Sequence, residues 1–306
     1  VSLIKKALEE AGYPHTPVVS LTFGSSLENK QPGLKVNWIK ILPVALRAIL
    51  YSDCISKFYY AAAAREKEVG QAARLRDDFL QQAEGLIRDK RSKDLLDLLS
   101  VAAEQFNAIC RDMNCPKVGV VGEIFLKFNP FAQKNVIGWL TEKGIEVVPS
   151  VLTDFFMQNF VNRKVRVESC IQKSAMPDFV YKSAYKIINK QIGKFNKAGM
   201  KFRYFIPFKD IFEEAADARK VISLNAQFGE GWLLPAEIMS YARQGIFNVV
   251  SLQPFGCIAN HIVSKGVEKR IKYFFPEMNI LSLDFDSGVS DVNITNRLLL
   301  FVDHLK

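Results

Sequence analysis

Short runs of β-branched residues alternate with longer helical stretches after Pro116, and this alternation limits the possible folds more than any other feature. Four such runs lie at residues 117–121, 145–148, 247–252 and 279–284. Apolar spacing of three and four predicts helices between and after them, at 131–143, 151–161, 178–197, 209–221, 231–244, 260–274 and 290–305. The pattern is typical of βαβ units around a parallel sheet. A fifth run, 202–206, is ambiguous.

The first 112 residues have a different pattern. Residues 3–11 predict a helix that ends at Gly12, residues 17–22 predict a short strand, and residues 36–112 predict a cluster of helices. We therefore expect an α/β fold, with a Rossmann-like parallel sheet of about four strands flanked by helices in residues 113–306 and a mainly helical segment in residues 1–112. Residues 1–22 are interpreted as the closing helix and strand of an upstream domain. Because the chain begins with Val1, we expect it to be part of a longer protein.

The composition is that of a soluble globular protein, with 49% hydrophobic and 24% charged residues. No run of about 18 apolar residues predicts a membrane span, and no secretory signal is recognisable. The five cysteines are an odd number without regular spacing, which favours a reducing cytoplasm.

The net charge of +9 is concentrated in one segment. Residues 1–162 carry 20 basic and 18 acidic groups (+2), residues 163–209 carry 12 and 2 (+10), and residues 210–306 carry 9 and 12 (−3). Helical spacing separates an apolar face from a lysine face in 178–197. The face expected in the core consists of Val180, Ala184, Ile187, Ile188, Ile192 and Phe195. The lysine stripe consists of Lys182, Lys186, Lys190, Lys194 and Lys197. It is either a solvated face or a docking surface for an acidic partner or for phosphates such as those of coenzyme A. Nucleic-acid binding is disfavoured, because no zinc-finger or RNP motif accompanies the basic segment.

Residues that follow predicted strands are the first candidates for a site, because ligands of open parallel sheets bind beyond the carboxyl ends of the strands. Glu123 follows the first strand, residues 253–261 follow the third, and residues 284–291 follow the fourth. Asp284, Asp286 and Asp291 are candidate cation ligands, although helix capping is the favoured interpretation.

Cys257 follows Pro254 and Gly256, which predict a tight turn just before a helix. The unpaired N–H groups and the dipole at a helix N-terminus favour the thiolate form of a nearby cysteine. A thiolate is a nucleophile or a ligand for a soft metal such as iron, and the alternative is a small buried cysteine. His261 is a candidate partner, although one helical turn usually aims such a side chain away from the N-terminus. The segment Gly229-Glu230-Gly231 precedes a predicted helix. Its glycines allow either a close approach of the backbone to a ligand or a turn of the chain. Dinucleotide, P-loop, nucleophile-elbow and zincin motifs are absent from the sequence.

Four segments in fixed order carry a family resemblance: VVGEIF with KFNP (120–130), GEGWLL (229–234), QPFGCIANH (253–261) and DFDSGVSDVN (284–293). Together they resemble the C-terminal part of the large CoA-substrate-specific enzyme activases, which are similar to the 2-hydroxyacyl-CoA dehydratases of the 2-hydroxyglutaryl-CoA dehydratase D-component superfamily. The resemblance covers roughly residues 115–300.

The resemblance implies a cytoplasmic, anaerobe-type system in which an activase uses ATP to deliver one electron to a dehydratase-like domain. That domain holds an iron–sulfur cluster and binds acyl-CoA, and Cys257 is the residue here that matches a cluster ligand. A 4Fe-4S cluster needs about three or four thiolates, and this chain has no second cysteine in a matching segment. Either segments outside this chain supply the other ligands, or this homologue has no cluster. The ATP-binding segment has no counterpart here, so ATP hydrolysis is not assigned to the chain.

Two functions are therefore expected. In the first, the chain contributes to an iron–sulfur electron-transfer or acyl-CoA site completed by other segments of a longer polypeptide or by a dehydratase-like partner. The parent then belongs to a lyase/activase redox system, and the isolated chain is inactive. The residues of this site are Glu123 and His261 as catalytic groups, Cys257 as metal ligand, and Gln253, Gly256, Asn260, Lys186 and Lys190 as cofactor-binding groups. In the second, the chain is a non-catalytic scaffold or a CoA- or partner-binding module without a cluster.

Overall fold

The structure is a computed structural model that describes residues 2–18, 37–173, 177–286, 288 and 290–305. The chain divides into two compact units, Val1–Ala45 and Leu46–Lys306. The first unit contains α1 (Ser2–Glu10), which confirms the helix expected there, and the start of α2 (Trp38–Ala63). Residues 17 and 18 are irregular, and the remainder of the strand expected at 17–22 lies outside the described residues.

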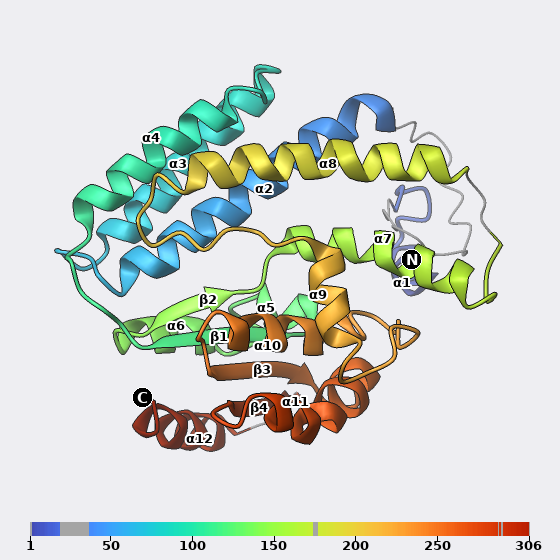
Figure 1. The fold of residues 1–306 in the computed structure, drawn as a ribbon. Coiled ribbons are helices and arrows are strands. Elements are labelled where there is room, and N and C mark those ends of the chain that lie inside the picture. Colours follow the sequence, from blue (N-terminus) through green and yellow to red (C-terminus); the bar gives the residue numbers. More distant parts are fainter. Residues whose placement is uncertain (1, 19–36, 174–176, 287, 289, 306) are drawn as a thin grey trace. The chain divides into compact units, whose positions relative to one another are not determined.

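A four-stranded parallel sheet forms the centre of the second unit, as the alternating pattern predicts (Figure 1). The strands are β1 (Lys117–Gly122), β2 (Glu146–Pro149), β3 (Asn248–Pro254) and β4 (Asn279–Phe285), in the order β2-β1-β3-β4. β1 and β3 are therefore the central strands. The ambiguous run 202–206 forms turns rather than a strand.

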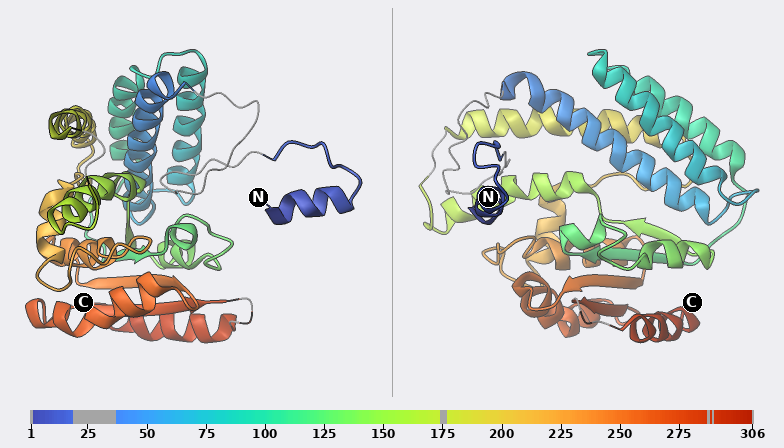
Figure 2. Two further views of the ribbon diagram at one scale, coloured as in Figure 1. Left: turned by 90° about the vertical axis from the view of Figure 1, so that its right-hand side faces the viewer. Right: turned by 180° about the vertical axis from the view of Figure 1, so that it is seen from behind.

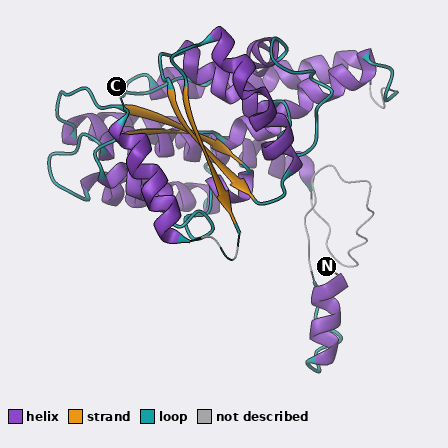
Figure 3. Cartoon of the chain, turned by 90° about the horizontal axis from the view of Figure 1, so that it is seen from below, coloured by secondary structure: helices purple, strands orange, loops and turns teal. Residues whose placement is uncertain are grey.

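Helices cover both faces of the sheet (Figure 3). On one face, α5 (Ile124–Lys127), α6 (Val136–Glu142) and α12 (Asp291–Asp303) pack on alternate residues of the strands, such as Val118 and Val250. On the other face, α10 (Leu233–Arg243) and α11 (Glu268–Phe274) pack on the intervening residues, such as Val121 and Val249. This two-sided burial explains why the strands are continuous apolar runs.

A second core lies beside the β2 edge of the sheet, as Figures 1 and 2 show. It is formed by α2, α3 (Gln71–Arg88), α4 (Leu95–Ile109), α7 (Leu152–Glu168), α8 (Asp178–Gly199) and α9 (Ile211–Ala218). Phe58, on α2, is fully buried, with its ring centroid 5.7 Å from that of Phe106 and 4.9 Å from that of Phe202. Helices from both sides of residue 112 thus share one core, and the two compact units divide after Ala45.

Two buried polar contacts join the helical core to the sheet. The Arg65 guanidinium donates to the Glu146 carboxylate at 2.6 Å, with 2% and 1% of the two side chains exposed. Asp53, on α2, accepts hydrogen bonds from the backbone N–H groups of Leu152 and Thr153, at 3.1 and 2.9 Å. The N-terminus of α7 is thereby capped by a side chain 99 residues away in sequence, which fixes α2 against the carboxyl end of β2.

The expected apolar face of α8 is only partly confirmed. Ile192 and Phe195 are buried, but Val180, Ala184 and Ile187 are exposed, so the expectation for these three is wrong. The first half of α8 lies on α7 through Tyr181 and Tyr185, whose rings lie 4.8 and 5.2 Å from that of Phe160. These contacts bury a different arc of the helix from the one that holds the exposed residues.

Candidate functional site

The turn that follows β3 brings Cys257 to the carboxyl edge of the sheet. The Cys257 N–H donates to the Pro254 carbonyl at 3.1 Å, and Gly256 has a φ of 79° at the third position of the turn. A type II turn requires a positive φ at this position, which explains the glycine. The tight turn expected from the sequence is confirmed, and it leaves the Cys257 side chain half-buried.

Asn260 contacts the thiol. Its amide nitrogen donates to the Cys257 sulfur at 3.2 Å, and its side chain is fully buried. The amide oxygen has no hydrogen-bond partner among the described residues. A buried amide that donates to sulfur provides the contact that a thiolate or a metal-bound sulfur accepts.

His261 is held between the turn and β4. Its Nε2 lies 2.8 Å from Asp284 Oδ1, and its Nδ1 lies 3.2 Å from the Cys257 carbonyl oxygen. Gln253, buried on β3, donates to the same Asp284 oxygen at 2.6 Å. Gln253 and Asp284 are register partners in neighbouring strands, so the sheet itself positions the carboxylate. Both ring nitrogens face oxygen acceptors, so the ring is oriented by the protein and not directed at the sulfur.

The helix expected at 260–274 is not a continuous α-helix. Ala259–Ser264 forms a π-helix, Lys265–Val267 a 3-10 turn, and only Glu268–Phe274 is α-helical. A helical segment does begin directly after Cys257, at Ile258, as expected, but its first turns are π-helical. Asn260, in this segment, supplies a polar contact to the sulfur. π-Helical segments are rare and are frequent at functional sites.

Glu123 is placed beside this turn but has a structural contact of its own. Its carboxylate accepts from the Leu126 N–H at 3.1 Å and caps α5, and its backbone N–H donates to Leu252 at 3.0 Å. Among the described residues it has no hydrogen bond to Cys257 or His261.

The glycines of the GEGWLL segment shape a loop. Gly231 has a φ of 46°, and a Cβ added there would lie 2.1 Å from the Ala226 carbonyl oxygen. The loop directs the buried Glu230 carboxylate to the Ile124 N–H, at 2.6 Å. It also brings Gly229 close to Ala259, since a Cβ at Gly229 would lie 3.8 Å from the Ala259 Cβ. With the contacts of Asp284 to Gln253 and His261, all four family-like segments therefore meet at one edge.

Exposed apolar side chains lie in these segments or directly next to them in the sequence. Between 54% and 75% of each of the following side chains is exposed: Phe125, Phe228, Phe255, Ile258 and Ile262. We call these five residues the carboxyl-edge patch. Clusters of exposed apolar side chains of this kind mark interaction surfaces.

The other predicted residues lie elsewhere or have separate contacts. Asp286 accepts from the Gly288 N–H at 2.8 Å, and Asp291 forms an ion pair with Lys134. All five lysines of the stripe are exposed and have no ion-pair partner in the part of the chain that the structure describes. Because α8 belongs to the helical layer, Lys186 and Lys190 are not brought to Cys257 (Figure 1).

A cluster of buried and half-buried charged residues between α2, α7, α9 and α10 was not predicted. Glu214 and Glu237 each have one carboxylate oxygen without a hydrogen-bond partner among the described residues, and both line a small cavity of about 40 Å³ with Asp154 and Lys57. Burial and the neighbouring Glu237 raise the pKa of Glu214 to about 7. Burial also raises the pKa of Asp154 and lowers that of Lys57. Sequence reasoning missed these groups because charged residues on helices usually face water.

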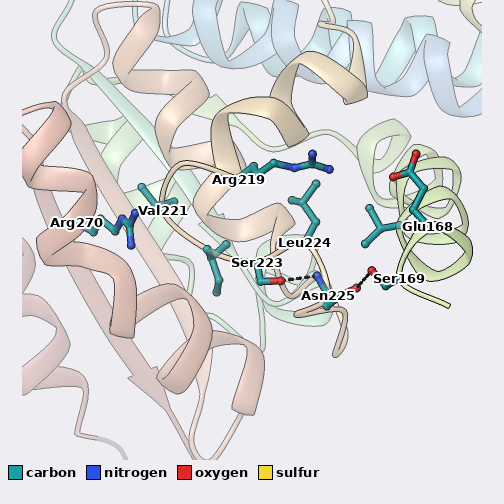
Figure 4. A pocket seen from close by; sticks show the side chains of 10 residues that line it. Glu168, Ser169, Arg219, Val221, Ser223, Leu224, Asn225 and Arg270 are labelled. Atoms are coloured by element: carbon teal, nitrogen blue, oxygen red, sulfur yellow. Dashed lines mark hydrogen bonds between the residues drawn. The ribbon is translucent and has the colours of Figure 1, made fainter. Parts of the chain in front are cut away.

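A hollow of about 680 Å³ lies between the end of α7, the loop after α9 and α11 (Figure 4). Its lining includes Arg219, Arg270 and Glu168, and Asn225 links its two sides through a 3.3 Å hydrogen bond from Ser169. No predicted site residue lines it, and its charged side chains are exposed.

No group of three or more His, Cys, Asp or Glu side chains is arranged to hold a metal within the described residues. Within the same residues, no helix combines the length and the apolarity needed to cross a membrane. Comparisons with protein-family models, curated proteins and solved structures return no match.

Proposed function

We propose that the chain is a module of a 2-hydroxyacyl-CoA dehydratase/activase-like protein. In this proposal Cys257 supplies one thiolate ligand of an iron–sulfur cluster, and other segments of a longer polypeptide or a dehydratase-like partner supply the remaining ligands. The cluster serves electron transfer or an acyl-CoA site. The observation that carries the proposal is the position of Cys257, half-buried at the carboxyl edge, with the buried Asn260 amide donating to its sulfur.

The surroundings of Cys257 support a shared site rather than a complete one. A 4Fe-4S cluster needs about three or four thiolates, and none of the other four cysteines joins Cys257 in a metal-holding group within the described residues. The carboxyl-edge patch provides the apolar surface on which a partner segment would exclude water from the cluster. Gln253, His261 and Asp284 form the polar side of the same edge.

Each residue of the edge has a role in this proposal. Asn260 donates to the ligand sulfur, which stabilises a metal-bound thiolate. Asp284 and Gln253 orient the His261 ring, which then faces the partner or an acyl-CoA thioester with a fixed geometry. When bound, the cluster supplies the one-electron chemistry, and Glu123 remains the cap of α5 beside it.

The docking role of the patch is tested by a charge substitution. Ile258→Asp and Ile262→Asp, made in the longer polypeptide purified without oxygen, are expected to lower its iron and sulfide content. Tyr273→Asp, at an 81% exposed position on α11, is the matched control and should leave both contents unchanged. Equal iron and sulfide in all three variants would contradict the proposal, provided that circular dichroism shows the variants folded.

A second candidate function rests on the lysine stripe, which is exposed and without ion pairs among the described residues. We propose as the alternative a binding module without a cluster, in which these lysines dock an acidic partner or the phosphates of coenzyme A. Lys186→Gln, Lys190→Gln and Lys194→Gln together should weaken acyl-CoA binding at low salt. Unchanged affinity would make the stripe a solvated face.

A further inference from the structure

A second pocket, separate from Cys257, lies where the helical layer meets the carboxyl ends of β1 and β2. Its volume is about 210 Å³. Lys127, Gln133 and Ser150 come from the α/β side, whereas Tyr60 and Arg76 come from α2 and α3. The pocket therefore lies at the edge of the sheet where parallel sheets bind ligands, and it is covered by helices.

Cationic groups lie at the floor and the rim of this pocket. The Lys127 side chain is 3% exposed, and its ammonium group donates to Glu237 at 3.2 Å, which leaves two of its three N–H donors. The Arg76 guanidinium lies 4.4 Å from the centre of the Tyr59 ring, and its Nε–H donates to Asp77 at 2.8 Å. Its two terminal NH₂ groups have no hydrogen-bond partner within the described ranges of the chain.

The rest of the lining adds further hydrogen-bonding groups. The hydroxyl groups of Ser56, Tyr59 and Tyr60, which can donate or accept, and the amide nitrogen of Gln133, which donates, make no hydrogen bond to any residue that the structure describes. The lining carboxylate is Asp53, and three donors already occupy it, including the Thr153 hydroxyl at 2.6 Å. The two cationic groups can only donate, so they favour a ligand that brings acceptors and negative charge.

The shape of the pocket limits the ligand further. Aromatic and aliphatic side chains such as Tyr60, Phe128 and Ile137 form its walls. A guanidinium with two available NH₂ groups matches a carboxylate with two parallel hydrogen bonds. The volume is below the roughly 300 Å³ typical of the smallest pockets for drug-sized ligands, which requires a small molecule.

We propose that this pocket binds a small organic carboxylate with a short apolar body. Arg76 binds its carboxylate, Lys127 and the tyrosine hydroxyls contribute further donors, and the aromatic walls enclose the apolar part. The proposal does not depend on Cys257 or on an iron–sulfur cluster.

Titration calorimetry of the folded chain with benzoate and with butyrate tests the proposal, because these probes share a carboxylate and differ in the size of their apolar part. Saturable binding of at least one of them is expected, and Arg76→Gln should weaken it at least tenfold. Arg88→Gln, an exposed arginine of the same helix, is the matched control and should bind as the unchanged chain does. Tyr60→Phe, which keeps the ring, should weaken binding several-fold and serves if Arg76→Gln does not fold.

Three results would overturn the proposal. They are no saturable binding of either carboxylate, equal loss in the Arg76 and Arg88 variants, and inorganic phosphate binding as tightly as the carboxylates.

Discussion

Breaking the buried Arg65–Glu146 ion pair should destabilise the fold strongly. Arg65 also donates to the Met113 carbonyl at 3.0 Å and to the Ala61 carbonyl at 2.8 Å, and its guanidinium lies 4.0 Å from the centre of the Tyr204 ring. Glu146→Leu leaves a guanidinium buried without its carboxylate. Removing one partner of a buried pair costs about 3–5 kcal/mol, so we expect the free energy of unfolding to fall by that amount.

Urea unfolding of four variants measures this cost. Arg65→Met should also destabilise, but the double variant Arg65→Met/Glu146→Leu should lose less than the sum of the two single changes, because it leaves no unpaired buried charge. The exposed pair Arg88–Glu84, at 2.5 Å, is the control, and Glu84→Leu should cost about 0–1 kcal/mol. A loss below about 1 kcal/mol for Glu146→Leu, or strict additivity in the double variant, would refute the reasoning.

Three further outcomes are expected. Burial raises the pKa of Glu214 from 4.5 to about 7, so the protonated carboxyl stabilises the fold fully below pH 4.5 and this stabilisation is lost as the pH rises towards 7. Glu214→Gln should therefore remove up to about 3 kcal/mol from the pH dependence of the free energy of unfolding. Urea unfolding across this pH range measures the change. Gly231→Ala, whose Cβ would lie 2.1 Å from a carbonyl oxygen, should lower the melting temperature more than Gly245→Ala, which has a positive φ but open space, and equal shifts would contradict the clash. Asp53→Ala removes the cap of α7 and should cost about 1–2 kcal/mol, with Asp53→Asn closer to the unchanged chain; a thermal melt that does not shift would exclude a stabilising cap.

The strands and most helices are predictable because their signals are local. Runs such as 117–121 are continuously apolar since both faces of the sheet are covered, and the structure extends this run by only one residue, to Gly122. The four-residue helix α5 and the π-helix at Ala259–Ser264 are too short or too irregular for a periodic pattern to reveal. Periodicity also identifies an apolar arc on α8 without showing which neighbours bury it, so Ile187 is wrongly expected in the core.

The residues of the candidate site that follow directly after strands were predictable from the sequence. Cys257, His261 and Asp284 meet because β3 and β4 are paired with Gln253 opposite Asp284. The sequence predicts that these two strand ends lie at the same edge of the sheet, but not the register that pairs Gln253 with Asp284 or the contact of His261 with Asp284.

Groups that tertiary packing alone brings together were not predictable. Glu214 and Glu237 lie on α9 and α10 and become neighbours of Lys57, on α2, only when the helical core forms beside the sheet. In the sequence each of them has the pattern of a solvated helical charge.

The central claim is tested most directly by the iron and sulfide content, after anaerobic purification, of the longer polypeptide that the proposal requires. Cys257→Ser is compared with Cys170→Ser, because Cys170 is also a free cysteine and is exposed. The proposal predicts that Cys257→Ser loses most of the iron, the sulfide and the visible absorption of thiolate-bound iron, whereas Cys170→Ser keeps all three. Equal iron and sulfide in the two variants would contradict Cys257 as a cluster ligand.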